Sequence, residues 1–281
     1  MAMFAGAVVE SFSVGVLPVE QFHTRAANAT RHRKCAKSYE ITVEFTNGWS
    51  INDVMDPIGS GAARDCFKLR ELPMVLKWFT ETTDARYTHL HQGELDGYLR
   101  VAGQPVARHL PAVYATRKLD VQNVKSGRAM EVDCLLTEFV GPTLYTLFRD
   151  EALTLDDVQK LFLKLLLMAQ CFIDAKVSWH QNLDVLSVCY NRRRQIWMMV
   201  EMDFEPPGRV SIASQVNRVG QRLRKELTNE TNPAFQELKR LIGQFMVIAT
   251  APWQWDGTSV TPVAQQLGID INSLEASTVD D

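Results

Sequence analysis

Alternating apolar and polar residues dominate the first half of the chain. From Tyr39, the segment YEITVEF alternates in the manner of a β-strand, and TNGW after it has the composition of a turn. Residues 54–79 predict a strand, a glycine turn, a strand, a turn and a strand, with Pro73 between the last two strands. AVYATRKLDV and MEVDCLLTEFV predict two further strands, joined by a polar turn near residue 126.

Helical patterns dominate the second half. One helix is predicted earlier, in TDARYTHLHQGELDGYLRVAG, with Gly103 near its end. After Gly141, the strongest helix is predicted in LTLDDVQKLFLKLLLMAQCFIDAKV, with Thr154 as its N-cap and acidic residues in its first turn. Apolar residues nearly encircle this helix, so we expect it to be buried. Two short strands separated by NRRR follow, and residues 211–250 predict two helices split at Pro233.

This order of elements predicts an α+β protein with two lobes. The strand-rich N-terminal lobe is expected to span residues 37–140, and the helix-rich C-terminal lobe residues 141–274. We expect residues 1–36 to be a flexible leader and the acidic residues 275–281 to be a disordered tail.

Composition narrows the possible functions. A hydrophobic content of 46% and a charged content of 22% are ordinary for a soluble globular protein. The net charge of −3 gives no support for a non-specific nucleic-acid binder, and the basic run RHRK is short and isolated. Apolar runs are all shorter than the roughly 18 residues that a spanning helix needs, so no membrane span is expected.

The cysteines indicate a reducing environment. There are five, an odd number, and none forms a CxxC pair, so neither a disulfide scaffold nor a zinc site is expected. His89 and His91 have no second ligand pair at metal spacing. We therefore expect a cytoplasmic or otherwise reducing compartment.

Several residues are candidates for nucleotide chemistry. Gly59 and Gly61 lie between two predicted strands, where a backbone can approach phosphates, although a plain hairpin turn has the same appearance. Lys77 lies in the middle of an apolar strand, where its ammonium needs either a partner or an edge position from which it reaches solvent. Glu94, on the predicted helix that follows, is the candidate partner.

Three later segments add further candidates. The strand that ends at Glu138 breaks at Gly141, and such a connector offers backbone groups to a flat base. The segment SWHQNLDVLSVCY places His180 in a polar loop before a strand. Asp203 ends another apolar strand, a position from which a carboxylate reaches Mg²⁺ or simply closes a turn.

The succession of these features, over residues 52–205, resembles the protein kinase superfamily. The resemblance implies a two-lobed protein kinase-like fold with a β-rich N-lobe and a shortened helical C-lobe, and it implies ATP and Mg²⁺ as ligands. It assigns the following roles: Gly59 and Gly61 to the phosphate-covering loop, Lys77 and Glu94 to the phosphate-binding ion pair, Thr137 to the back of the nucleotide pocket, Glu138 to Val140 to the adenine-contacting hinge, His180 to the first position of the catalytic loop, and Asp203 to the metal-binding position.

The sequence departs from the kinase pattern at catalytic positions. Asn182 stands where the family has the catalytic aspartate, and Ser187 where it has the metal-binding asparagine. Arg64 replaces the third loop glycine, and Glu205 the glycine after the metal aspartate. An asparagine accepts a hydrogen bond but takes no proton, so we expect impaired catalysis. Asp184, which lies two residues further on, is a candidate displaced base; the alternative is a solvated turn residue.

These observations predict a pseudokinase that binds ATP and acts through a protein partner. The alternative is an active, divergent ATP- and Mg²⁺-dependent protein kinase or small-molecule phosphotransferase. A third hypothesis is a kinase-like chain that binds no nucleotide.

Overall fold

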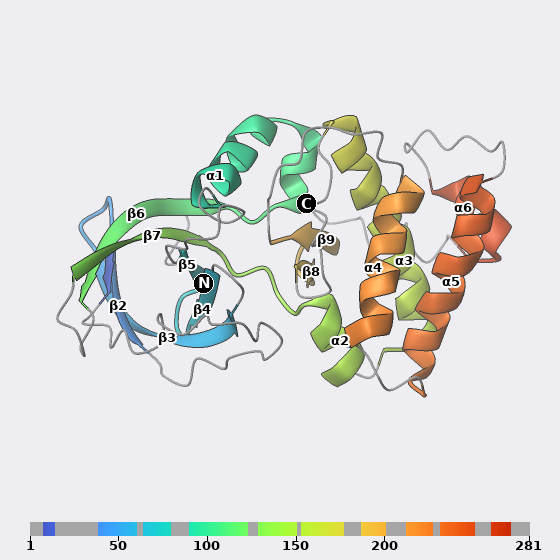
Figure 1. The fold of residues 1–281 in the computed structure, drawn as a ribbon, viewed down its shortest axis with the longest axis horizontal. Helices are drawn as coiled ribbons and strands as arrows, with labels where there is room; N and C mark the ends of the chain where they lie inside the picture. Colours follow the sequence, from blue (N-terminus) through green and yellow to red (C-terminus); the bar gives the residue numbers. More distant parts are fainter. Residues whose placement is uncertain are drawn as a thin grey trace. The chain divides into compact units, whose positions relative to one another are not determined.

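The computed structural model describes residues 8–14, 39–60, 64–79, 90–122, 129–150, 153–176, 187–200, 212–226, 231–250 and 260–270 (Figure 1). The chain divides into two compact units: residues 1–92 with 111–139, and residues 93–110 with 140–281. The first contains a large antiparallel sheet and the second most of the helices, which is the α+β mixture that the sequence predicts. Among the described helices, none is both long and apolar enough to cross a membrane.

Seven strands form the sheet of the first unit, in the order β1-β2-β3-β4-β5-β7-β6, and all neighbours are antiparallel. The strands are β1 (Val9–Val14), β2 (Tyr39–Phe45), β3 (Ser50–Ser60), β4 (Arg64–Leu69), β5 (Met74–Phe79), β6 (Val113–Gln122) and β7 (Ala129–Glu138). The strands predicted from alternation in residues 39–45, 54–79 and 112–140 are therefore confirmed.

The sheet is strongly curved and nearly closed. Phe12 of β1 and Leu119 of β6 belong to the same buried cluster, although these strands are the two edges of the sheet. Arg117 of β6 donates a hydrogen bond from Nη1 to the carbonyl oxygen of Phe12 across 2.7 Å. One face of the sheet thus encloses its own core, because the edges approach each other.

Residues 9–14 differ from the sequence-based expectation of a flexible leader. They form β1, which pairs with β2 and buries Val9 and Phe12. The segment VESFSV alternates only weakly in hydrophobicity, and its burial depends on contacts with β2 and β6 that are remote in sequence. Apart from Val8, the rest of the predicted leader lies outside the described residues.

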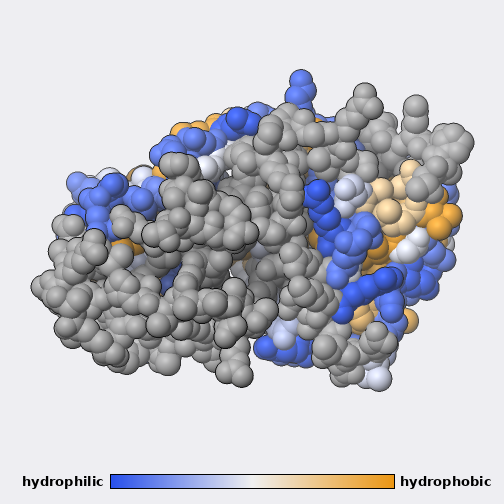
Figure 2. All heavy atoms as spheres, viewed as in Figure 1, coloured by the Kyte–Doolittle hydropathy of each residue, from blue (hydrophilic) through white to orange (hydrophobic). Residues whose placement is uncertain are grey.

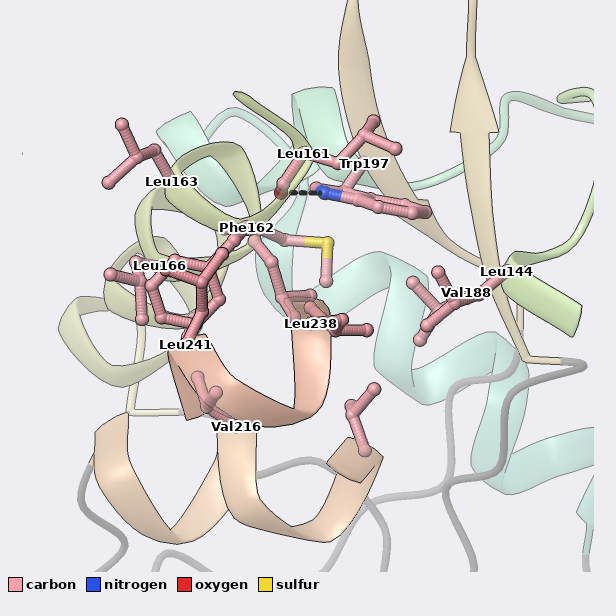
Figure 3. Close-up of a cluster of buried hydrophobic side chains, with 14 of the residues drawn as sticks. Leu144, Leu161, Phe162, Leu163, Leu166, Val188, Trp197, Val216, Leu238 and Leu241 are labelled. Carbon is pink, nitrogen blue, oxygen red and sulfur yellow. Dashed lines mark hydrogen bonds between the residues drawn. The ribbon is translucent and has the colours of Figure 1, made fainter. Parts of the chain in front are cut away.

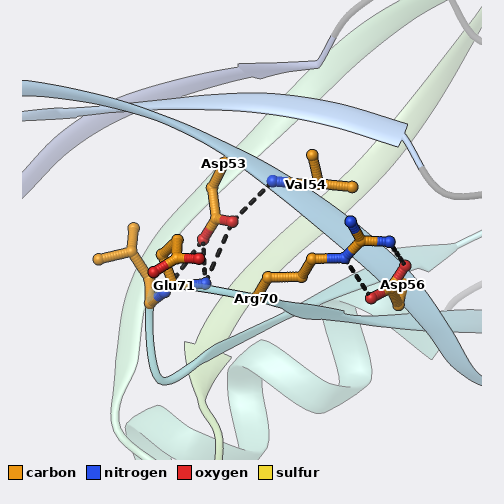
Figure 4. A network of polar contacts seen from close by, with 6 residues as sticks. Asp53, Val54, Asp56, Arg70 and Glu71 are labelled. Atoms are coloured by element: carbon orange, nitrogen blue, oxygen red, sulfur yellow. Dashed lines mark hydrogen bonds and ion pairs between the residues drawn. The ribbon is translucent and has the colours of Figure 1, made fainter.

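A buried carboxylate fixes the turn between β4 and β5 (Figure 4). Asp53 is 5% exposed, and its oxygens accept hydrogen bonds from the backbone N–H groups of Val54, Glu71 and Leu72 at 2.6–3.2 Å. These bonds satisfy a charge that would otherwise be costly to bury. The adjacent pair of Arg70 and Asp56 lies at the surface.

The second unit combines helices with a two-stranded hairpin. Its elements are α1 (Leu90–Val101, which begins in the first unit), the 3₁₀ helix η3 (Pro105–His109), α2 (Leu144–Asp150), α3 (Leu155–Asp174), β8 (Val188–Asn191), β9 (Ile196–Met199), α4 (Ile212–Glu226), α5 (Pro233–Thr250) and α6 (Thr261–Leu267). The split between α4 and α5 before Pro233 is as predicted. On the face shown in Figure 2, hydrophilic residues lie over α4 and more apolar ones over the α5–α6 region, where Val247 is 72% exposed.

Helix α3 is the centre of this unit. Thr154 caps its N-terminus in a reciprocal capping box with Asp157, as the sequence predicts. The helix is buried over most of its length and packs with α4, α5 and the hairpin (Figure 3). The indole Nε1 of Trp197 donates a hydrogen bond to the carbonyl oxygen of Leu161, so β9 is attached to α3 by a polar contact inside the apolar core.

The segment that follows β7 packs tightly on the hairpin. Gly141 has a φ of +137°, and a Cβ built there would lie 2.5 Å from the carbonyl oxygen of Tyr190. The N–H of Tyr190 donates to the carbonyl oxygen of Pro142 at 3.0 Å. Only glycine fits at position 141, because any side chain would meet both backbone strain and a backbone atom.

Candidate functional site

Lys77 is a buried lysine in the centre of the sheet. It pairs with Cys66 of β4 on one side and with Leu135 of β7 on the other, and it is 2% exposed. Its strand neighbours Leu76 and Trp78 belong to the enclosed core, so Lys77 points to the opposite face of the sheet. It is therefore neither an edge residue nor a lysine that reaches solvent.

The face that carries Lys77 is also buried. Val75 and Phe79 flank it on β5 at 8% and 6% exposure, and Thr137 lies opposite Val75 at 1%. At the start of α1, His91 packs its ring edge-on against Phe79 and hydrogen-bonds through Nε2 to the hydroxyl of Thr116 at 3.0 Å. An ammonium in such surroundings requires anionic or hydrogen-bonding partners.

Glu94 is buried on the helix that follows. It lies on α1 in one stripe with Gly97 and Val101, and it is 1% exposed. Glu94 belongs to the second unit and Lys77 to the first. Two ionisable groups at the positions that the kinase resemblance assigns are thus deeply buried, which is uncommon for Lys and Glu in proteins.

Gly59 lies near the end of β3, opposite Cys66, directly after a β-bulge. It is exposed, its φ is not in the left-handed region, and a Cβ added there would meet no atom of the described residues within 4 Å. The fold itself therefore does not demand a glycine at position 59.

The hinge candidates are partly engaged by the sheet. The Glu138 N–H donates to the carbonyl oxygen of Ala112 at 2.8 Å, and the Phe139 N–H to that of Pro73 at 2.8 Å. The Glu138 carboxylate accepts from the N–H of Ala112 at 3.2 Å. The Val140 N–H makes no hydrogen bond to another described residue.

Val140 is anchored by its side chain. It is 7% exposed and packs with Cys189 of β8 and Met198 of β9. The connector was predicted to offer free backbone groups, but two of its three N–H groups, those of Glu138 and Phe139, already bond within the sheet unit.

Ser187 lies at the open end of the β8–β9 hairpin. It is 1% exposed, and its carbonyl oxygen accepts from the N–H of Val200 at 2.9 Å. The chain therefore enters β8 and leaves β9 at the same end of the hairpin. Gly61, His180, Asn182, Asp184 and Asp203, which are the remaining predicted site residues, lie outside the described part of the chain.

Within the described ranges, no group of three or more His, Cys, Asp or Glu side chains is placed to hold a metal ion. Of the two predicted metal ligands, Ser187 alone lies in those ranges.

His109 is a buried polar residue that the sequence analysis did not single out. It is 2% exposed; its Nδ1–H donates to the carbonyl oxygen of Trp197 at 2.7 Å, and Nε2 accepts from the Nε–H of Arg108 at 3.1 Å. Burial, followed by the nearby charge of Arg108, lowers the pKa of His109 to about 4, although the bond to Trp197 opposes the shift. The neutral ring therefore joins η3 to β9 inside the second unit.

A scan against models of known protein families found no match, and a search of curated proteins found no similar sequence.

Proposed function

We propose that this protein is a kinase-like pseudokinase that binds ATP with Mg²⁺ and acts through a protein partner. The observation that carries the proposal is the burial of Lys77 in the middle of β5. Lysines are seldom fully buried in proteins, and a buried ammonium is suited to hold phosphate oxygens.

The neighbours of Lys77 in the sheet support this role. Strand β4 on one side leads back to the turn that follows Gly59, and β7 on the other side leads to the hinge residues Glu138 to Val140. Adjacent strands lie about 4.8 Å apart, so the cross-strand row from Gly59 through Cys66 to Lys77 spans roughly 10 Å. The kinase resemblance requires this neighbourhood of glycine turn, lysine and hinge.

The hairpin of the second unit supports the metal part of the proposal. Asp184 precedes Ser187 by three residues, and Asp203 follows Val200 by three. In the sequence, both aspartates therefore lie within three residues of the hydrogen-bonded pair Ser187 and Val200. A loop carboxylate and a metal-binding carboxylate need such proximity.

Impaired catalysis follows from the chemistry of the substituted residues. Asn182 cannot take a proton from an acceptor hydroxyl, and loss of a general base costs about 10²–10⁴-fold in rate. Ser187 offers Mg²⁺ a hydroxyl where kinases offer an amide carbonyl. Binding of nucleotide relies on other groups and is expected to survive.

Thermal unfolding with and without Mg-ATP tests nucleotide binding. Binding to the folded state at 100 times the dissociation constant stabilises by about 2.7 kcal/mol, so we expect Tm to rise by several degrees. Lys77→Met should abolish this rise. Lys118→Met is the matched control, because Lys118 is 60% exposed on β6 of the same sheet and forms a surface ion pair with Glu131.

Substitution of a buried lysine also perturbs the fold, so a second variant is needed. Gly59→Ala introduces no clash with the described residues, and it should leave the Tm of the ligand-free protein unchanged while weakening the response to Mg-ATP. An undiminished response in both Lys77→Met and Gly59→Ala would show that the nucleotide pocket is wrongly assigned.

Release of γ-phosphate separates the pseudokinase from the alternative of an active kinase or small-molecule phosphotransferase. We expect wild-type turnover far below the 1–100 s⁻¹ typical of kinases, and an increase on the order of 10²-fold in Asn182→Asp. A wild-type rate in the ordinary range that falls in Asp184→Asn would instead support an active enzyme with a displaced base.

A further inference from the structure

The turn between β8 and β9 carries three successive arginines, Arg192, Arg193 and Arg194. All three are exposed, at the end of the hairpin opposite to Ser187 and Val200. In the sequence, NRRR predicts only a turn, and it is not part of the proposed nucleotide site. A hairpin turn of this length is stable without arginine, so the turn alone does not explain them.

The backbone of this turn is fixed by side-chain hydrogen bonds. Asn191, at 6% exposure, accepts from the N–H of Arg194 at 3.0 Å. Gln195 adopts a φ of +53°, and its Nε2 donates to the carbonyl oxygen of Arg192 at 2.6 Å. The bases of the three arginine side chains are therefore held in one arrangement.

A fourth cation adjoins the turn. Lys164 of α3 donates from Nζ to the hydroxyl of Tyr190 at 3.3 Å, and that hydroxyl donates to the Oε1 of Gln195 at 2.9 Å. Lys164 has no carboxylate partner among the described residues. Burial, followed by the charge of Lys160, lowers the pKa of Lys164, as expected for an ammonium whose charge is not balanced locally.

Two acidic residues in the first turn of α3, the helix that carries Lys164, have partners of their own. Asp156 forms an ion pair with Lys160 at 2.7 Å. Asp157 accepts hydrogen bonds from the N–H and hydroxyl of Thr154 in the capping box. The turn and Lys164 thus bring four cationic side chains to one hairpin, whose turn is held by side-chain hydrogen bonds.

We propose that Arg192, Arg193, Arg194 and Lys164 bind a phosphorylated segment of the partner protein. A phosphoryl group carries close to two negative charges and three acceptor oxygens, which match the paired donors of guanidinium groups. Arg192 and Arg194 also make contacts within the chain, but each guanidinium has five N–H donors to share. The inference rests on the proposed partner-binding role and is independent of nucleotide binding.

Fluorescence anisotropy with a synthetic peptide that carries two neighbouring phosphoserines tests the site. The unphosphorylated peptide is the reference, and we expect it to bind at least about tenfold more weakly. The triple variant R192Q/R193Q/R194Q should weaken binding of the phosphopeptide by a similar factor. Its fold should be intact, because the three side chains are exposed.

A second triple variant controls for net charge. R224Q/K239Q/R240Q removes an equal number of positive charges, three, from α4 and α5 of the same unit. It should retain phosphopeptide affinity within about twofold. Equal losses in both triple variants, equal affinity for both peptides, or binding to phosphatidylserine vesicles without binding to the phosphopeptide would each overturn the assignment. The Mg-ATP response of R192Q/R193Q/R194Q should equal that of wild type, so failure of the nucleotide proposal is measured separately.

Discussion

His109 shows how a single buried side chain couples the protein to pH. Its neutral tautomer uses both ring nitrogens, with Nδ1–H donating to Trp197 and Nε2 accepting from Arg108. Protonation at Nε2 would place an N–H against the N–H of Arg108. The fold therefore resists protonation, which agrees with the lowering of its pKa to about 4.

The lowered pKa of His109 leads us to expect a loss of folding stability in mild acid. The folded pKa of His109, about 4, lies below the ordinary value of 6.5, so the unfolded chain takes up the proton first as pH falls. The stabilisation is fully present above pH 6.5 and is lost on acidification; between pH 6.5 and pH 5 the free energy of unfolding should fall by about 2 kcal/mol. Urea unfolding at several pH values measures this slope.

His109→Gln is the diagnostic variant for that prediction. It removes the titrating group, so the slope between pH 6.5 and pH 5 should largely disappear even though the variant is less stable at pH 7. A slope that persists unchanged in His109→Gln would assign the acid sensitivity to other groups.

Lys77 and His109 also show which buried polar residues can be recognised in a sequence. Lys77 was predicted as a candidate because an ammonium within an apolar strand conflicts with its immediate neighbours. His109 gave no such signal, since it follows Arg108 in a short polar-apolar stretch and its acceptor on Trp197 is 88 residues away. Conflicts with local pattern are visible in a sequence, whereas partners brought by the fold are not.

At the scale of elements, one crowded glycine and one with open space around it predict opposite effects of substitution by alanine on stability. Gly141 has a φ of +137° and faces the carbonyl oxygen of Tyr190, whereas Gly243 lies within α5 with open space around its Cβ position. Gly141→Ala should destabilise the protein by on the order of 3 kcal/mol. Gly243→Ala should stabilise it by up to about 1 kcal/mol, because alanine loses less backbone entropy in a helix.

Chemical denaturation of both glycine variants measures the difference. Each variant adds one methyl group to the same unit. Opposite changes in the free energy of unfolding would therefore be due to the position of the methyl group. A Gly141→Ala variant as stable as wild type would contradict the close packing of this segment on β8.

Elements with strong internal signals were predictable, and those that depend on remote contacts were not. Helix α3 carries its own cap at Thr154 and a long apolar run, and its predicted start is confirmed. Strand β1 has neither, and it is defined by pairing with β2 and by the bond from Arg117 to Phe12. The roles of Lys77 and Glu94 stay predictions, although the burial of both side chains is observed.

At the scale of the whole molecule, the near closure of the sheet makes β1 essential. A shortened chain that begins at Lys37 would lack β1, leave the edge of β2 unpaired and lose the buried side chains of Val9 and Phe12. Loss of these two side chains costs on the order of 4 kcal/mol. We expect lower stability and self-association.

Size-exclusion chromatography and urea unfolding measure these effects. A chain that begins at Val8 keeps β1 and is the control, and it should behave as the full-length protein does. If the chain that begins at Lys37 remained monomeric and equally stable, β1 would not be an integral part of the sheet.

The division of the chain has a practical consequence for fragment experiments. Residues 93–110 lie in sequence between the two segments of the first unit, but they belong to the second unit. They supply Val101, Val106 and Leu110 to its core and include His109, which bonds to Trp197. A single cut near residue 140 therefore leaves the C-terminal piece without three of its core side chains. Mixing residues 140–281 with a synthetic peptide covering 90–110 would reconstitute what the cut removes, and the gain in helicity on mixing would report that complementation.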